Sequence, residues 1–283
     1  MHPVSLRALS LGYLAAPRLA NTVNGMLRIH SAFRQTLNLQ AQDGELLPII
    51  SADSSLNHPD ALRVAVPENW DWRTASEVQF RDGGLVSRTW QLSLQNVPVW
   101  TPVSCTLTGA VTPALAVLAD ALRDWCQREP VDSVLRLLPD DAFGVQVDIS
   151  AGHSAQQLAG MANQIIGLGG GLTPDGDDYL LGYFAALAVS RHPAITRHRQ
   201  TLAGVVIPRL SRTNDISRHY LNRAAEGHFS EAIALLMAEC CGPLRPAVLR
   251  ERANGVMAFG AASGADCMAG ILHGLRTLSA FAQ

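Results

Sequence analysis

The chain has 283 residues, of which 48% are hydrophobic, enough for one large folded domain or two of ordinary size. Its 22 Lys and Arg residues nearly balance its 24 Asp and Glu residues without forming a basic block, which argues against a nucleic-acid-binding surface. No apolar run spans a membrane without a charge, a proline or a glycine-rich break, so we expect no membrane partner. The five cysteines lack metal-type spacing, and we interpret them as reduced thiols of a cytoplasmic protein.

Residues 1–110 are predicted to form a β-rich domain, because short alternating apolar runs are separated by turn residues. Asp43-Gly44 lies inside "TLNLQAQDGELLPII" and Asp82-Gly83-Gly84 inside "SEVQFRDGGLVSRTW"; both predict β-hairpins. "LRVAVP" and "WQLSLQ" predict two further strands. Such a set of short strands is typical of an antiparallel β-barrel or sandwich, which closes or covers its edges.

Residues 111–283 are predicted to form a mainly α-helical domain. "PALAVLADALRDWCQR" has apolar residues at helical spacing, and two more helices are expected to begin after the capping residues Ser154 and Ser230. "ITRHRQTLAGVVIPRL", "DISRHYLNRAAEG" and "PAVLRERANGVMAFG" predict further helices, whereas "FGVQVDIS", 143–150, is strand-like. The expected fold class is therefore α+β, with central buried helices that contain glycine.

The stretch "GLGGGLTPDGDD" combines glycines with three aspartates. Because Pro174 cannot continue a preceding helix, we expect a loop over 167–176 and a helix that starts near Asp177 or Asp178. The next residues, "YLLGYFAALAV", are apolar on every face and indicate a central helix. A helix cap explains one aspartate, but Asp175, Asp177 and Asp178 crowd like charges that need a cation, a basic side chain or backbone N–H groups as compensation.

A similar pattern recurs near the C-terminus, where "GADCMAGILHGL" aligns with "GDDYLLGYFAAL". The alignment pairs Gly176 with Gly264, Asp178 with Asp266, and Gly182 with Gly270. We expect two central helices that cross closely at their glycines and present their N-termini side by side. Helix ends favour an anion and carboxylates favour a metal ion, whereas two capped helices that only pack together remain the structural alternative.

The richest group of basic and hydroxyl side chains lies in "SRTNDISRHYLNRAAEGHF". Thr213 and Ser217 share one helix face and are expected to line a cleft, with Arg212 or Arg218 able to hold a carboxylate or phosphate. A helix cap followed by a solvated face is the alternative. Elsewhere, the sequence lacks a Walker-type lysine, a G-x-S-x-G elbow and paired histidine ligands, which argues against nucleotide, serine-hydrolase and zinc chemistry.

Three segments, "GLGGGLTPDGDDYLLGYFAAL", "SRTNDISRHYLNRAAEGHF" and "FGAASGADCMAGILHGL", together resemble one bacterial family, as does the β-rich "GMLRIHSAFRQTLNLQAQDGELLPI". The family, formerly of unknown function, includes the smallest subunit of the oxamate carbamoyltransferase of allantoin degradation. The resemblance covers nearly the whole chain. It implies a carbamoyltransferase subunit, or a relative of one, that has other subunits as partners and acts on oxamate or a similar small acid.

Our leading hypothesis is a small anionic substrate, oxalurate with phosphate or oxamate with carbamoyl phosphate, bound at the paired helix N-termini. The candidate catalytic residues are Asp177, Asp178 and Asp266. The candidate substrate-binding residues are Gly169, Gly170, Gly171, Thr173, Gly176, Arg212, Thr213, Ser217, Ser263 and Gly264. Two alternatives are a non-catalytic binding or scaffolding subunit, and a phosphoryl-transfer enzyme that uses Mg²⁺ or Mn²⁺ held by Asp177 and Asp178.

Overall fold

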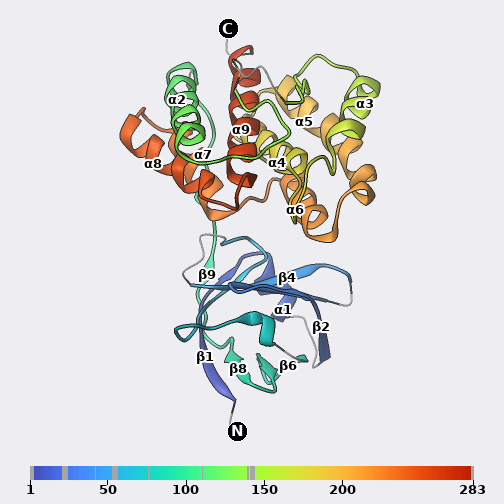
Figure 1. The fold of residues 1–283 in the computed structure, drawn as a ribbon, viewed down its shortest axis with the longest axis vertical. Coiled ribbons are helices and arrows are strands. Elements are labelled where there is room, and N and C mark those ends of the chain that lie inside the picture. The colour runs from blue at the N-terminus through green and yellow to red at the C-terminus, as the bar shows by residue number, and fades with distance from the viewer. Residues whose placement is uncertain are drawn as a thin grey trace. The chain divides into compact units, whose positions relative to one another are not determined.

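The chain divides into two compact units, Met1–Pro102 and Val103–Gln283, each with its own hydrophobic core. A computed structural model describes residues 3–20, 25–41, 43–52, 57–75, 77–109, 111–138, 140 and 144–281. The first unit consists mainly of strands and the second of helices (Figure 1). The predicted α+β class is therefore confirmed.

The first unit is a closed β-barrel. Its strands are β1 (Val4–Gly12), β2 (Gly25–Ala32), β3 (Thr36–Gln40), β4 (Leu46–Ser51), β5 (Leu62–Ala65), β6 (Val78–Arg81), β7 (Gly84–Ser87), β8 (Trp90–Ser93) and β9 (Val99–Trp100), with helix α1 (Ala15–Ala20) and the short helix η1 (Trp72–Thr74). The strand order is β5-β4-β3-β2-β6-β7-β8-β1, and β1 also pairs with β5, which closes the ring and leaves β9 beside β1. Most pairs in the ring are antiparallel, while β1–β8 and β4–β5 run parallel.

Both predicted hairpins are confirmed. Asp82 and Gly83 have φ angles of 54° and 71°, the positive values that a tight turn between β6 and β7 requires. Gly44, at φ 84°, lies between the antiparallel strands β3 and β4. Inside the barrel, Trp72 and Trp90 are buried with their rings edge to face, 5.6 Å between centroids, so both tryptophans are core residues.

The second unit is a helical bundle. Its helices are α2 (Thr112–Arg128), α3 (Ala155–Ile165), α4 (Asp175–Ala188), α5 (Pro193–Val206), the 3-10 helix η2 (Ile207–Arg212), α6 (Asp215–Glu226), α7 (Glu231–Cys241), α8 (Pro246–Met257) and α9 (Ser263–Ser279). Ser154 caps α3 as predicted, in a reciprocal capping box with Gln157. Ser230 occupies the N-cap position of α7 but makes no side-chain cap bond.

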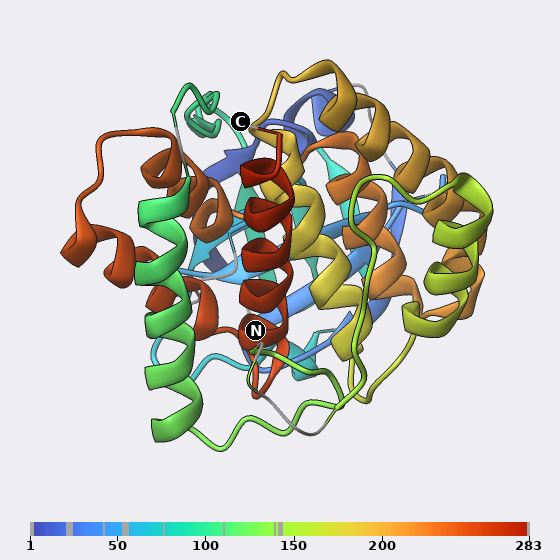
Figure 2. The ribbon, with the colours of Figure 1, turned by 90° about the horizontal axis from the view of Figure 1, so that it is seen from above.

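Helices α4 (yellow) and α9 (red) run side by side through the middle of the bundle (Figure 2). Nearly every residue of α4 is buried, as its uniformly apolar sequence predicts. The helix begins at Asp175, two residues earlier than the first predicted start. Pro174 is the reason, because its fixed φ of −55° suits a helix entry and its carbonyl accepts the Asp178 N–H at 3.1 Å.

The strand predicted over 143–150 is wrong for the residues that the structure describes, 144–150. This segment makes only an isolated bridge between Leu135 and Val145. Its C-terminal end binds helices instead, since Ile149 O accepts a hydrogen bond from the Tyr183 hydroxyl and Ser150 bonds to His273. In the described part of the chain, no helix is both long and apolar enough to cross a membrane.

Candidate functional site

Helices α4 and α9 touch backbone to backbone at two glycines. A methyl group at Gly182 would lie 1.9 Å from the carbonyl oxygen of Cys267, and one at Gly270 would lie 2.0 Å from the carbonyl oxygen of Tyr179. The predicted crossing at these glycines is therefore confirmed. It brings the two helix starts together, where the hydroxyls of Thr173 and Ser263 are 2.9 Å apart.

A pair of buried carboxyl groups lies in the first turns of these helices. Asp178 is 8% exposed and Asp266 is fully buried, and neither caps its own helix. One oxygen of Asp266 accepts a hydrogen bond from Ser133 Oγ at 2.5 Å, and Asp178 is bonded to the hydroxyls of Ser263 and Thr173. The Oδ2 atom of each aspartate has no hydrogen-bond partner among the described residues. Buried oxygens without partners are rare and point to a missing ligand.

Asp178 is strongly disposed to hold a proton. Burial raises the pKa of Asp178 well above its usual range, and the nearby charges of Asp266 and Asp177 raise it further. Hydrogen bonds from Ser263 and Thr173 oppose this increase without overcoming it. These surroundings therefore favour the protonated carboxyl, which can donate a hydrogen bond.

Asp266 titrates near neutrality. Burial raises its pKa from 3.8 to about 7, the Ser133 hydroxyl lowers it, and the charge of Asp175 raises it. A carboxyl with this pKa exchanges its proton readily at physiological pH, which is the property that general acid or base catalysis requires.

Asp177 has a different role, although it is adjacent to Asp178. Its Oδ1 accepts the Gly167 N–H at 2.9 Å, and its Oδ2 accepts the hydroxyls of Thr213 at 2.5 Å and Ser217 at 2.6 Å. Thr213 and Ser217, which were expected to bind substrate, therefore bind Asp177 and not the acid pair, our name for Asp178 and Asp266. The three residues fasten the glycine-rich loop to the start of α6.

The aspartates near the start of α4 have different hydrogen-bond partners. Asp175 accepts the Val134 N–H at 2.9 Å, and both oxygens of Asp177 are occupied. Within the described ranges, no three potential ligand groups close enough to share an ion include Asp177, Asp178 or Asp266. Because Mg²⁺ is usually held by one or two carboxylates together with several waters, a metal ion at Asp177 and Asp178 stays a prediction.

The predicted glycines fall into two groups. Gly169, Gly176 and Gly264 are packed against other atoms: a methyl group at these positions would lie 2.6 Å from the Asp175 side chain, 2.0 Å from Ile165 O and 2.4 Å from Val256 O, respectively. Gly170 and Gly171 are exposed and face open space, with Gly171 at φ 81°. Gly176 and Gly264 are buried, whereas Gly169, Gly170 and Gly171 are exposed and leave their backbone accessible to a ligand.

The two candidate arginines, Arg212 and Arg218, bind other groups of the protein. Arg212 is exposed and donates to the carbonyl oxygen of Asn163 at 2.9 Å. Arg218 donates to Leu210 O at 3.2 Å and pairs with Asp215 at 3.1 Å. Neither guanidinium is hydrogen-bonded to the acid pair.

A second polar network lies between α4 and α9, and the sequence motifs did not predict it. His273 is 2.8 Å from both Ser150 Oγ and the Tyr179 hydroxyl, while the Tyr183 hydroxyl is 3.0 Å from His198 Nε2. Burial lowers the pKa of His273 to about 4, so the ring is neutral at pH 7. Tyr179 and Tyr183 lie one turn apart on α4, and this spacing is the sequence signal that could have indicated the network.

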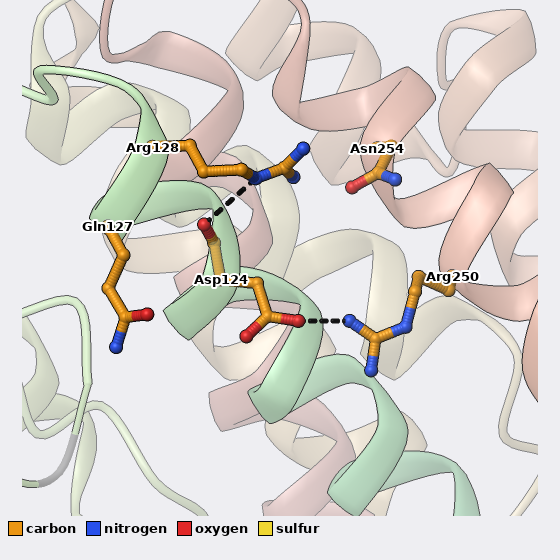
Figure 3. Close-up of a pocket in the computed structure, with 5 residues that line it drawn as sticks. All are labelled: Asp124, Gln127, Arg128, Arg250 and Asn254. Atoms are coloured by element: carbon orange, nitrogen blue, oxygen red, sulfur yellow. Dashed lines mark hydrogen bonds and ion pairs between the residues drawn. The ribbon is translucent and has the colours of Figure 1, made fainter.

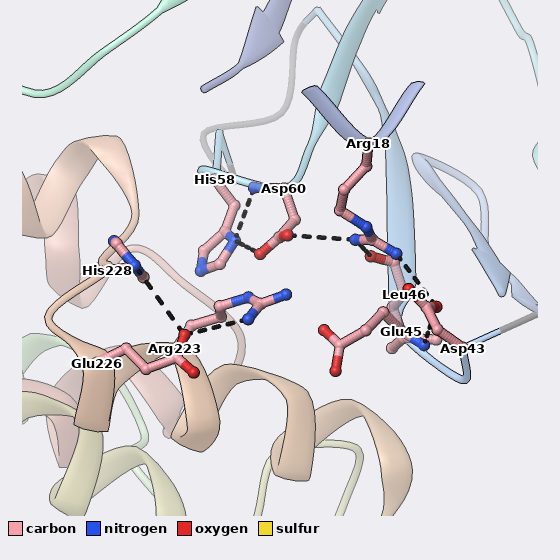
Figure 4. A network of polar contacts seen from close by, with 9 residues as sticks. All are labelled: Arg18, Asp43, Glu45, Leu46, His58, Asp60, Arg223, Glu226 and His228. Carbon is pink, nitrogen blue, oxygen red and sulfur yellow. Dashed lines mark hydrogen bonds and ion pairs between the residues drawn. The ribbon is translucent and has the colours of Figure 1, made fainter. Parts of the chain in front are cut away.

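Two other polar regions contain none of the predicted residues. An open pocket between α2 and α8 is lined by Asp124, Gln127, Arg128, Arg250 and Asn254, and its arginines are held by Asp124 (Figure 3). In the barrel, the buried Asp60 pairs with Arg18 at 3.4 Å and with His58 at 3.6 Å (Figure 4). In the helical unit, the same figure shows Glu226 paired with Arg223 at 3.1 Å.

The barrel, the helical bundle and the acid pair between two crossing helices define a two-unit α+β protein with a small buried polar site. Residues 165–275 match the family model described as oxamate carbamoyltransferase subunit AllH, and residues 7–99 match the AllH family N-terminal domain. The chain belongs to the AllH family, which confirms the resemblance. Membership supports a role as a carbamoyltransferase subunit in allantoin degradation, with further subunits as partners. No curated protein and no solved structure matches the chain.

Proposed function

We propose that this chain is the subunit of an oxamate carbamoyltransferase that binds a small anionic substrate at the first turns of α4 and α9. The observation that carries the proposal is the acid pair, Asp178 and Asp266, each with a buried oxygen that lacks a hydrogen-bond partner among the described residues. Burying such groups costs free energy unless a ligand completes their hydrogen bonds.

The surroundings of the acid pair offer hydrogen-bond donors that suit a carboxylate or phosphate. No described residue accepts a hydrogen bond from the backbone N–H groups of Gly170, Gly171 or Leu172, and all three residues are exposed. The N-terminus of α4 adds a partial positive charge. Asp178, when protonated, supplies a further donor toward an anion.

The same groups suit the chemistry of carbamoyl transfer. This reaction develops negative charge on the carbamoyl oxygen and on the leaving group, and aimed donors stabilise that charge without a protein nucleophile. Asp266, with a pKa of about 7, can accept or return the proton of the substrate nitrogen. The hydroxyls of Thr173 and Ser263 would orient the substrate.

The binding proposal is tested by calorimetric titration of oxamate, oxalurate and carbamoyl phosphate into the purified chain. Asp178→Ala should weaken binding about tenfold or more, because a hydrogen bond to a charged ligand contributes roughly 1.5–3 kcal/mol. Asp132→Ala is the matched control, since Asp132 is exposed and next to Ser133. Equal affinities for both variants, with folding intact, would remove the acid pair from the site.

A second experiment separates binding from catalysis. Carbamoyl phosphate formation from oxalurate and phosphate is measured with the lone chain and with the complete set of subunits. We expect binding by the lone chain but turnover only in the complex, where Asp178→Ala should abolish it. Full turnover by the lone chain would show that no partner is needed for the chemistry.

A further inference from the structure

A three-residue segment, 133–135, joins the first turns of α4 and α9, and we call it the strap. It lies in the connection between α2 and α3. The Ser133 hydroxyl donates to Oδ1 of Asp266 in α9 at 2.5 Å, and the Val134 N–H donates to Oδ2 of Asp175 in α4 at 2.9 Å. The strap therefore holds one carboxylate oxygen in each of the two central helices.

The backbone of the strap is also fixed from its other side. The Val145 N–H donates to Val134 O at 2.7 Å, and the Arg136 N–H donates to Val145 O at 3.1 Å. Gly144, at φ 96°, allows this approach, because a methyl group there would lie 2.6 Å from the carbonyl oxygen of Leu135. The Leu135 side chain is buried in the helical core. The position of the strap is therefore set independently of the aspartates that it binds.

The Ser133 hydroxyl has a single proton, and its surroundings direct that proton to Asp266. The Leu135 N–H donates to Ser133 Oγ at 3.1 Å and so occupies a lone pair of the hydroxyl. The proton is left for Asp266 Oδ1, whereas Asp266 Oδ2 is buried without a hydrogen-bond partner among the described residues. One oxygen of Asp266 is held by the protein, and the other has a fixed direction.

We propose that Ser133 is a positioning residue, which holds Oδ1 of Asp266 so that Oδ2 alone meets the substrate as a base. The inference rests on the proposed function, because it needs a substrate at the acid pair. In the direction of oxamate carbamoylation, Oδ2 takes the proton of the oxamate nitrogen as this nitrogen bonds to the carbamoyl carbon. The C–O bond to phosphate breaks, phosphate leaves with its electron pair, and the proton is then returned to the phosphate.

The charges around Asp266 make the Ser133 hydroxyl important for this role. Burial raises the pKa of Asp266 to about 7, with the hydroxyl lowering it and the charge of Asp175 raising it. The titratable groups that face Asp266 are the acids Asp175 and Asp178 and the buried thiol of Cys267, and none of them supplies a positive charge. Without the hydroxyl, the carboxyl would keep its proton at pH 7 and could not accept another.

The first readout is the pKa of Asp266, followed in the full chain by the ¹³C shift of its carboxyl group, with Asp266→Asn to assign the signal. In Ser133→Ala, the carboxyl should hold its proton about tenfold more tightly, because a hydrogen bond to the charged form is lost. Ser133→Thr keeps the hydroxyl and should restore the wild-type value. Ser279→Ala is the matched control, since Ser279 also lies in α9 and its hydroxyl has no partner among the described residues.

The second readout is turnover of oxamate and carbamoyl phosphate by the complete set of subunits. The rise of kcat with pH reports ionisation of the base, so it should move to higher pH in Ser133→Ala while KM changes little. This variant should be several-fold slower than the wild type at pH 7 and equal to it at high pH. A purely structural role would instead lower kcat at every pH.

The outcomes separate this inference from the proposed function. If the pKa of Asp266 is unchanged in Ser133→Ala while Asp178→Ala still loses binding, the proposed function stands and the role of Ser133 is wrong. A raised pKa with an unmoved kcat profile would also overturn the inference, because Asp266 would not be the base. If Ser133→Ala does not fold, Ser133→Cys, with a weaker donor of similar size, should raise the pKa by less, and an unchanged value there has the same meaning.

Discussion

Asp177 and Asp178 follow each other in the chain, but a helix turns by about 100° per residue, so their side chains face different neighbours. Asp177 is enclosed by hydrogen-bond donors from the loop and from α6. Asp178 keeps one oxygen without a partner among the described residues. Substitutions at the two positions should therefore fail in different ways.

Replacing Asp177 with Asn should lower stability. The amide group of Asn would turn a donor toward the Gly167 N–H or toward the hydroxyls of Thr213 and Ser217, which also donate. We expect a loss of about 1–3 kcal/mol in the free energy of unfolding, measured by urea denaturation. Asp132→Asn, on an exposed side chain, should change it by less than about 0.5 kcal/mol. An unchanged stability in Asp177→Asn would show that this carboxyl does not brace the loop.

Asp266 should make stability depend on pH. The pKa of Asp266 is about 7 in the folded protein, whereas an unperturbed aspartate, as in the unfolded chain, has a pKa of 3.8. Between these two pH values the folded protein keeps a proton that the unfolded chain has lost. The stabilisation is complete below about pH 4 and is lost as the pH rises through about 7. The Asp266→Asn variant has no titrating group at this position. The free energy of unfolding of the wild type minus that of the variant should therefore fall by on the order of 2–4 kcal/mol from pH 4 to pH 8.

The comparison with Asp266→Asn also removes the opposite contribution of His273. The pKa of that ring is lowered to about 4, so its stabilisation is lost as the pH falls. Both proteins carry His273, and its effect cancels in their difference. A difference that does not vary with pH would show that Asp266 has an ordinary pKa.

At the scale of elements, the crossing of α4 and α9 should tolerate no side chain. Gly182→Ala and Gly270→Ala each place a methyl group about 2 Å from a backbone oxygen, so the helices must separate. We expect each to cost at least roughly 3 kcal/mol, above the usual range for overpacking, measured by thermal and urea denaturation.

Two other helical glycines provide the matched controls. A methyl group at Gly160 in α3 or at Gly204 in α5 meets nothing within 4 Å. Alanine at these positions should raise stability by about 0.5–1 kcal/mol, because glycine disfavours a helix interior. If all four variants behaved alike, the effect would come from helix propensity and not from the crossing.

The crossing could be predicted from the sequence because it rests on spacing within each helix: Gly182 and Gly270 each follow an aspartate by one turn. The hydrogen-bond partners of Asp177 could not be predicted, since Thr213 lies in the turn before α6, Ser217 lies on α6, and no local pattern links either residue to Asp177. The alternation of apolar and polar residues in 143–150 predicted a strand. Ile149 O and Ser150 Oγ are instead hydrogen-bonded to side chains of helices. Local patterns thus predict elements well, and long-range hydrogen bonds poorly.

At the scale of the whole molecule, the two units have separate cores, which predicts that they fold separately. A fragment spanning 103–283 should show a cooperative thermal transition and a helical circular dichroism spectrum. It should also bind the same small acids as the full chain, because the acid pair and its neighbours all lie within it. A fragment that stays unfolded would show that the helical unit depends on the barrel.

The contacts at Gly182 and Gly270 also constrain how related sequences can diverge. A clash between two side chains can be relieved when the second one shrinks in a later mutation. Here each glycine meets a main-chain oxygen, of Cys267 or Tyr179, which every amino acid carries. No substitution at the opposing position can remove that oxygen, so both glycines should stay fixed whichever side chains occupy positions 179 and 267.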